Sequence, residues 1–260
     1  MTSRILLALL LSVISSFAHA QWELLPGRAS AIGVGARGDA WVIGIDQVEG
    51  GHSIYRWAGN DWQIVPGGAV RIDVDPQGSP WVVNSFGNIL RLGPSGWQSL
   101  PGLVRDIGIG ANGAVWAIGV TPTTGGFMIY RWNGSDWDLI PGGAVAIDVD
   151  PRGNPWVIND AGDLLRLERG AWQRVSRRAA AVTIANDGNA WMLGRQSVPG
   201  GYSVLRQGEN GWVKVPGGAV ALSAGPTPWL VNSDGQVYRW QQQQQRQGRR
   251  QQGKSWQERY

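Results

Sequence analysis

The sequence predicts an all-β protein, a six-bladed β-propeller of four-stranded antiparallel blades arranged as three double-blade repeats. Three observations carry this prediction: a tryptophan template that repeats at fixed spacing, turns rich in Gly and Pro, and short segments with period-two alternation. Repetition over a few tens of residues is typical of solenoids, propellers and arrays. Four-stranded sheets repeated radially are the blades of a propeller, which leaves only short sheet edges exposed.

All 16 tryptophans fall on that template. Seven begin a W-x-x-(I/L/V)-like segment: Trp22, Trp62, Trp97, Trp137, Trp172, Trp212 and Trp256. Six lie in a G-x-x-W-like segment: Trp41, Trp81, Trp116, Trp156, Trp191 and Trp229. Three end a Y-R-W triplet: Trp57, Trp132 and Trp240. Large aromatic side chains fill the space between wedge-shaped blades, so we interpret the tryptophans as packing residues first.

The first six leading tryptophans are spaced by 40, 35, 40, 35 and 40 residues, so the repeating unit is a pair of about 75 residues used three times. Each unit begins with a predicted Pro-Gly turn, except the fifth, where Ser176-Arg177-Arg178 stands instead. A strand with period-two alternation follows, clearest at residues 70–75 and 145–150. A Gly turn leads into the second strand, and the third strand carries an arginine in register: Arg56, Arg91, Arg131, Arg166, Arg206 and Arg239.

Two ways of closing the ring remain open, because seven leading tryptophan segments serve six sets of the other strands. Either Trp22 to Leu25 supplies the outer strand of the last blade, or the segment at Trp256 does. Trp22 runs straight into Pro26-Gly27, as most internal copies do, which favours the N-terminal closure.

The two ends of the chain are predicted to lie outside the propeller, which spans residues 21–240. Residues 1–20 have the features of a signal peptide that is cleaved after Ala20: Arg4, an apolar run from Ile5 to Val13, and Ala18-His19-Ala20. We therefore expect a secreted or periplasmic protein. Residues 241–260 form a Gln- and Arg-rich basic tail with little to bury, for which disorder is the default. Such a tail could contact anionic surfaces peripherally.

The basic pI of about 9.8 belongs to this tail. Residues 21–240 hold 17 basic and 18 acidic side chains, so the predicted propeller is nearly neutral. Nucleic-acid binding usually needs a basic face on the domain itself, so no nucleic-acid partner is expected. Cysteine is absent, which excludes thiol catalysis and thiolate metal sites.

Three even-numbered units share a longer run of identities. From Trp62 to Arg91, from Trp137 to Arg166 and less completely from Trp212 to Arg239, W-x-x-(I/V)-P-G-G-A is followed by G-x-x-W-x-V-N-x-x-G-x-(I/L)-x-R. This run resembles the tectonin family, the tachylectin-like propellers that include fish egg lectins. The resemblance spans residues 22–240. It implies a six-bladed propeller and, as in several members, binding of glycans that include bacterial surface sugars; other members are interaction modules.

The units differ between the second and third strands, where odd units carry long loops and even units carry short turns. Propeller topology places these loops on one face. Planar amides and carboxylates with a nearby aromatic suit sugars, so we expect a ligand site at Asn84, Ser85, Asn159, Asp160, Asn232 and Ser233. The alternative is that these residues only satisfy turn geometry, which also favours Asn and Ser.

Features of an enzyme are weak. After the predicted signal the chain has one histidine, His52, in a loop with no repeat equivalent, so no catalytic residues, no metal site and no cofactor are predicted. Two functions remain: an exported lectin for surface glycans or lipopolysaccharide, and an exported protein-interaction scaffold without sugar binding. Exposed aromatics beside the Asn/Ser turns favour the lectin, whereas a broad apolar patch favours a protein partner.

Overall fold

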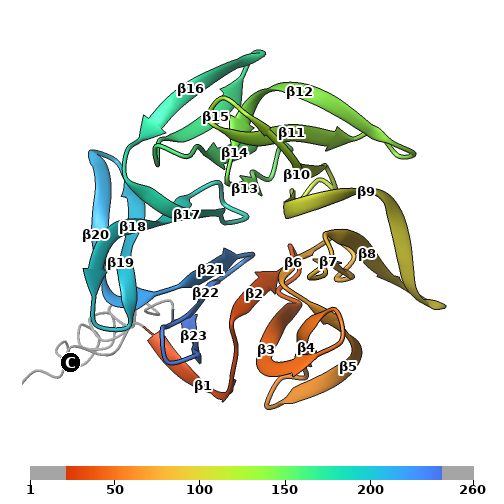
Figure 1. Ribbon diagram of the computed structural model, residues 1–260. Coiled ribbons are helices and arrows are strands. Elements are labelled where there is room, and N and C mark those ends of the chain that lie inside the picture. Colours follow the sequence, from red (N-terminus) through yellow and green to blue (C-terminus); the bar gives the residue numbers. More distant parts are fainter. Residues whose placement is uncertain (1–21, 242–260) are drawn as a thin grey trace, which may run out of the picture.

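A computed structural model describes residues 22–241, and within them every regular element is a β-strand (Figure 1). The predicted signal peptide and nearly all of the predicted tail, with Trp256, lie outside the described residues. The sheets are set around a common centre, in a propeller-like arrangement of four-stranded blades.

Four sheets have four strands and one has seven. The first blade contains β2 (Ala31–Val34), β3 (Ala40–Val48), β4 (Gly51–Trp57) and β5 (Trp62–Ala69). The seven-stranded sheet contains β6 (Arg71–Val74), β7 (Pro80–Val83), β8 (Asn88–Gly93), β9 (Gly96–Ile109), β10 (Val115–Thr123), β11 (Gly126–Trp132) and β12 (Trp137–Ala144). The next blade contains β13 (Ala146–Val149), β14 (Pro155–Ile158), β15 (Leu164–Glu168) and β16 (Ala171–Ser176).

The following blade contains β17 (Ala179–Ile184), β18 (Ala190–Val198), β19 (Gly201–Gly208) and β20 (Gly211–Ala219). The last blade combines the two ends of the described chain: β21 (Ala221–Ala224), β22 (Pro228–Val231), β23 (Gln236–Trp240) and β1 (Trp22–Arg28). Trp22 lies opposite Trp240 in the antiparallel β1–β23 pair. The N-terminal closure is therefore the one that the protein uses.

The inner strands contact one another in a closed series, from β2 through β6, β9, β13, β17 and β21 back to β2. The long strand β9 takes part in two blades: its residues 96–103 pair with β8 and its residues 104–109 pair with β10. The single strand β9 is thus the outer strand of one blade and the inner strand of the next. It therefore merges two four-stranded groups into the seven-stranded sheet.

The apolar core is divided among the gaps between successive blades. For example, Leu25, Val231 and Val237 of the last blade pack against Ile32 and Val42 of the first. The other clusters of the described residues join neighbouring blades in the same way. The central strands of a blade therefore bury residues toward both neighbouring blades, which explains why strands such as Pro80–Val83 are buried along their whole length.

The Pro-Gly segments are bulges within the outer strands rather than the separate turns that the sequence predicted. In the first blade, Ile54 pairs with Val65 and Ser53 pairs with Gly68, so Pro66 and Gly67 are inserted without partners in the register. The same two-residue insertion occurs at 26–27, 101–102, 141–142 and 216–217. Pro has no N–H to donate to a ladder, and bulges are one of the places where strands tolerate it.

Each of these bulges binds the leading tryptophan of the next blade. The indole Nε1–H of Trp62 donates to the Pro26 carbonyl at 2.8 Å, and that of Trp97 donates to the Pro66 carbonyl at 2.6 Å. Trp137, Trp172 and Trp22 donate in the same way to Pro101, Pro141 and Pro216. The sixth leading tryptophan, Trp212, makes no such bond within residues 22–241, because the preceding blade lacks the Pro-Gly pair.

In three of the bulges, at Gly27, Gly67 and Gly142, this contact leaves no space for a Cβ. A Cβ on Gly67 would lie 2.9 Å from Nε1 of Trp97, and its φ of +134° is a conformation that L side chains rarely adopt. Gly142 has the same relation to Trp172, with 2.8 Å and +137°. The Pro-Gly pair therefore supplies both the carbonyl that accepts the indole hydrogen bond and the space for the indole ring.

The arginines of the third strands have a structural role. Each guanidinium lies over the second-strand tryptophan of its own blade, 4.9–5.9 Å from the ring centroid; the pairs are Arg56–Trp41, Arg91–Trp81, Arg131–Trp116, Arg166–Trp156, Arg206–Trp191 and Arg239–Trp229. This separation is within the range of cation–π attraction. Ion pairs of the described residues support some of them, such as Arg91–Asp75 at 3.0 Å.

We predict that Trp137→Phe lowers the free energy of unfolding more than Trp212→Phe does, by about 1 kcal/mol, because only Trp137 loses an interblade hydrogen bond. Both changes remove the same ring volume, so urea unfolding of the two variants isolates the bond. Equal losses for both variants would show that the Pro carbonyl contributes nothing.

Candidate functional site

The predicted site residues lie on three short turns at one face of the molecule. Asn84 and Ser85 follow β7, Asn159 and Asp160 follow β14, and Asn232 and Ser233 follow β22. Each turn contacts the tip of the long hairpin of the preceding blade. The backbone N–H groups of Ser85, Asp160 and Ser233 donate to the carbonyls of Gly50, Gly125 and Gly200, at 2.8, 3.0 and 2.9 Å.

The long segments of the odd units, interpreted as loops from the sequence, are extended hairpins. Strands β3 and β4 continue to Val48 and Gly51 and leave only two residues for the turn. A register shift between Ile43 and Gln47 accommodates extra residues in β3. The face therefore carries three extended hairpin tips that alternate with three short turns.

The asparagine oxygens are used within their own turns. Oδ1 of Asn84 accepts from the N–H groups of Phe86 and Asn88, both at 3.0 Å. Oδ1 of Asn159 accepts from Asp163 N–H at 2.8 Å, and Oδ1 of Asn232 accepts from the N–H groups of Asp234 and Gln236. These asparagines therefore stabilise their own turns, which is the alternative role that the sequence also predicted. Ser85, Asp160 and Ser233 are exposed beside these turns.

The first of these turns borders a shallow cavity of about 200 Å³ between the first blade and its neighbour. Asn84, Phe86 and Trp97 line it on one side, and the Gly50 tip with Gly67 and Gly68 of the bulge lines the other. The Phe86 ring is 66% exposed. The cavity thus combines two aromatic rings with an amide and backbone groups.

A related cavity of about 310 Å³ lies at the last blade, two units away around the ring. It is lined by Trp22, Asn232 and Asp234, with Gly200 of the hairpin tip and Gly217 of the bulge. Trp22 and Asn232 correspond in the repeat to Trp97 and Asn84. The structure thus brings two of the three predicted asparagines to equivalent cavities.

Trp97, Trp22 and Phe86 are site residues that the sequence did not predict, and the repeat template indicated a packing role for the two tryptophans. Trp97 has both a packing role and a place in the candidate site. Its Nε1–H donates to the Pro66 carbonyl, while its ring lines the cavity. Phe86 stood out in the sequence as an apolar residue in the polar turn Asn84-Ser85-Phe86-Gly87. That contrast was the available signal.

A second polar cluster lies along the central axis. Carboxylate oxygens of Asp73 and Asp148 accept from the N–H groups of Ile109 and Ile184 on the next inner strands, at 2.6 and 2.7 Å. Asp106 accepts from Ile147 N–H at 3.2 Å. These side chains therefore join neighbouring blades at the axis and have their acceptors occupied by the fold.

Burial raises the pKa of these carboxyl groups. It raises the pKa of Asp106 to about 6, against the opposing charge of Arg71, and that of Asp148 to about 7. For Asp73, burial and the negative charge of Asp148 raise the pKa well above its usual range. Within residues 22–241, no group of three or more His, Cys, Asp and Glu side chains has an arrangement that could hold a metal ion.

The structure contains, in the part that it describes, no helix with the length and apolarity needed to cross a membrane. The sequence profile of the Tectonin domain matches residues 12–123 and 119–258. No curated protein matches the sequence.

Similar solved structures share the fold at low identity. YCF48 bound to D1 peptide is 17% identical, with 87% of this chain and 85% of that chain covered and a TM-score of 0.51. The calcium-binding protein regucalcin from Agrobacterium tumefaciens is 14% identical, with 84% and 90% covered and a TM-score of 0.57. A gluconolactonase from Xanthomonas campestris is 13% identical, with 84% and 97% covered and a TM-score of 0.54.

The raised pKa of Asp106 predicts a stability that falls with rising pH. A carboxyl group whose pKa is higher in the folded than in the unfolded chain stabilises the fold fully at pH values below its ordinary pKa, near 3.8. This contribution is lost as the pH rises through the folded-state pKa of about 6. The free energy of unfolding of the unchanged protein should therefore decrease by about 3 kcal/mol, relative to Asp106→Asn, between pH 4 and pH 8.

Urea unfolding at a series of pH values measures this difference. Asp138→Asn, which removes one carboxylate from the outer strand β12, is the control for a change of one charge. A difference between the unchanged protein and Asp106→Asn that does not vary with pH contradicts the prediction.

Proposed function

The chain belongs to the tectonin family, and on this premise we propose that it is an exported lectin-like β-propeller that binds surface glycans or lipopolysaccharide sugars. The proposed binding surface is the face formed by the short turns and the hairpin tips. The proposal is of binding without catalysis, since the acceptor groups near the turns are engaged in structural hydrogen bonds and the single histidine after residue 20 is isolated in one hairpin.

The proposed form of the protein has six blades after removal of residues 1–20. Counting the seven-stranded sheet as two blades that share β9 gives six, in agreement with the three repeats of about 75 residues. Cleavage after Ala20 would leave Trp22 free to form β1, the strand that completes the last blade. The proposed location is secreted or periplasmic.

The observation that carries the glycan proposal is the lining of the cavity at Asn84. Sugar rings present an apolar face that packs on an aromatic ring and hydroxyl groups that bond to amides and backbone groups. Trp97 and Phe86 offer the first kind of contact, and Asn84 with the Gly50 region offers the second. The related cavity at Trp22 and Asn232 provides a second copy, which suits a multivalent surface glycan.

A protein-interaction scaffold remains the second candidate, and one observation favours it. Phe86, Leu103 and Val48 are exposed apolar side chains near the same turn, and Leu103 approaches Gly87 closely. An apolar patch of this kind suits a peptide segment. The similar fold of YCF48 has been solved with a bound D1 peptide, which illustrates that such propellers can take one.

We expect the triple change Asn84→Asp, Asn159→Asp and Asn232→Asp to reduce glycan binding about tenfold or more. Aspartate keeps an oxygen for the turn N–H groups but replaces the amide donor by a carboxylate, so the hydrogen bonds to sugar hydroxyls change. At Asn232 the change also removes the bond from Nδ2 to Gln236 Oε1, whereas the turns at Asn84 and Asn159 keep their hydrogen bonds. Binding of the mature protein to a glycan array, followed by titration of the strongest glycan, measures the effect.

Phe86→Ala tests the aromatic contact, and Leu139→Ala is its control, because Leu139 is a similarly exposed apolar residue on the outer strand β12. Phe86→Ala should weaken glycan binding and Leu139→Ala should not. Absence of binding to every glycan, together with capture of a peptide that depends on Phe86, would replace the lectin by the scaffold.

A further inference from the structure

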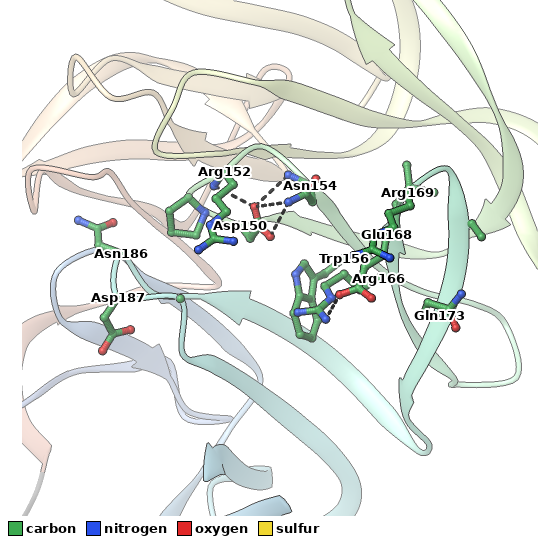
Figure 2. Close-up of a pocket in the computed structure, with 14 residues that line it drawn as sticks. Asp150, Arg152, Asn154, Trp156, Arg166, Glu168, Arg169, Gln173, Asn186 and Asp187 are labelled. Atoms are coloured by element: carbon green, nitrogen blue, oxygen red, sulfur yellow. Dashed lines mark hydrogen bonds and ion pairs between the residues drawn. The ribbon is translucent and has the colours of Figure 1, made fainter. Parts of the chain in front are cut away.

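The opposite face of the molecule carries a larger cavity, of about 990 Å³, that the proposed glycan site does not include (Figure 2). It lies among the β13–β14 turn, the β15–β16 turn and the β17–β18 turn of the next blade. Antiparallel strands place these turns at the other ends of the strands from Asn84, Asn159 and Asn232. Its floor contains Trp156 and Arg166.

The equivalent place in the earlier even blade, 75 residues before, shows what these two side chains normally bind. There, the buried carboxylate of Asp75 accepts through Oδ2 from Trp81 Nε1–H at 3.4 Å and from Arg91 Nη2 at 3.0 Å. One carboxylate oxygen thus joins the tryptophan and the arginine of the cation–π pair. Asp75, Trp81 and Arg91 correspond to Asp150, Trp156 and Arg166.

In the later blade, β13 to β16, the corresponding carboxylate of Asp150 binds a different partner. The Nδ2 amide of Asn154 donates to both oxygens of Asp150, at 3.2 and 3.0 Å, where the earlier blade has Ser79. Arg166 pairs instead with Glu168, where the earlier blade has Gly93. Figure 2 shows the Asp150–Asn154 group and the Arg166–Glu168 pair on separate sides of the cavity.

Two buried donors are left without an acceptor as a result. Trp156 Nε1–H and Arg166 Nε–H have no hydrogen-bond partner among residues 22–241, and the Trp156 side chain is only 2% exposed. A buried N–H without an acceptor lowers stability and is rare in folded proteins. In the sister blade, the partner that satisfies this pair of side chains is a carboxylate oxygen.

The rim of the cavity also carries more positive charge than the equivalent place in the earlier blade, which favours binding of an anion. Arg152 and Arg169 line the cavity where the earlier blade has the neutral Gln77 and Pro94. The acidic groups nearby are engaged: Glu168 pairs with Arg166, and Asp187 accepts from the Nδ2 amide of Asn189 at 2.6 Å. The two arginine side chains are exposed at the opening of the cavity.

We propose that this cavity binds an oxyanion, a carboxylate or phosphate group. One anionic oxygen accepts from Trp156 Nε1–H and Arg166 Nε–H, much as Asp75 Oδ2 accepts from Trp81 Nε1–H and Arg91 Nη2–H, and Arg152 and Arg169 hold the remaining charge. Gln173 lines the same cavity and offers its amide to the rest of the ligand, whereas the Nδ2 amide of Asn186 donates to the Ala36 carbonyl at 2.6 Å. The site is on the other face from the proposed glycan site and does not depend on it.

The test follows the indole N–H resonance of Trp156 in the ¹⁵N-labelled protein, assigned through Trp156→Phe. Sodium glucuronate and inorganic phosphate are added in separate titrations, and neutral glucose is the control ligand. We expect a saturable downfield shift of this resonance with at least one anion and none with glucose. A response to glucuronate alone identifies a carboxylate site, and a response to phosphate alone identifies a phosphate site.

Asn154→Ser restores the residue of the earlier blade and releases Asp150 toward Trp156 and Arg166. It should reduce anion affinity about tenfold or more, because the protein then supplies its own acceptor. Arg152→Gln should also weaken binding, whereas Arg37→Gln, at the same turn position in the first blade, should leave it unchanged.

The Arg152 and Arg37 pair keeps the test decisive if Asn154→Ser does not fold. No shift of the Trp156 resonance with either anion overturns the proposal. So does an equal shift with glucose, or an equal loss of affinity in Arg152→Gln and Arg37→Gln.

Discussion

The hydrogen bond from five of the six leading tryptophans of residues 22–241 to the proline carbonyl of the preceding blade is the contact on which the ring depends. Secondary structure satisfies the backbone within a blade, but neighbouring blades meet mainly through apolar side chains, which carry no direction. The indole-to-carbonyl bond adds direction at the outer edge, and the bulge glycine lets the ring approach. The bond from Trp22 to Pro216, which spans 194 residues of sequence, closes the circle with the same chemistry.

Most of the tryptophan and arginine side chains of the repeat serve packing, and the turns at the two faces border the candidate sites. Trp41 and its five equivalents are buried beneath arginines, and Trp57 and Trp132 pack edge-on or tilted against leading tryptophans at 4.9 and 5.0 Å. Residues that hold blades together can vary little without loss of stability. The ends of the strands are not so restricted, and the two faces can therefore acquire different binding surfaces.

The sequence was sufficient for the repeat, the strand positions and the preferred closure, because these depend on spacing and alternation along the chain. It was insufficient where a residue acts on a distant one. Pro66-Gly67 was predicted as a turn, since its role as a bulge becomes visible only when Trp97 of the next blade is placed against it. Asn84 could be chosen from the turn pattern, but its partners Trp97 and Gly50 lie on other strands. The Trp156 N–H is unpaired because the Asp150 carboxylate binds the Asn154 side chain, a contact that the sequence alone does not show.

Repetition also explains how one blade could depart from the others. Interactions of a repeated fold are mostly between neighbours, so a change in one unit affects few contacts. The fifth unit has lost the Pro-Gly pair, and Arg178 there adopts a φ of +59° while the ring remains closed. The preceding unit keeps its Pro-Gly pair and its bond to Trp172, yet exchanges Ser79 and Gly93 of its sister for Asn154 and Glu168. The bond of Trp172 secures the outer edge of that blade, so the fold tolerates the loss of an internal hydrogen bond that leaves two buried donors, Trp156 Nε1–H and Arg166 Nε–H, without an acceptor.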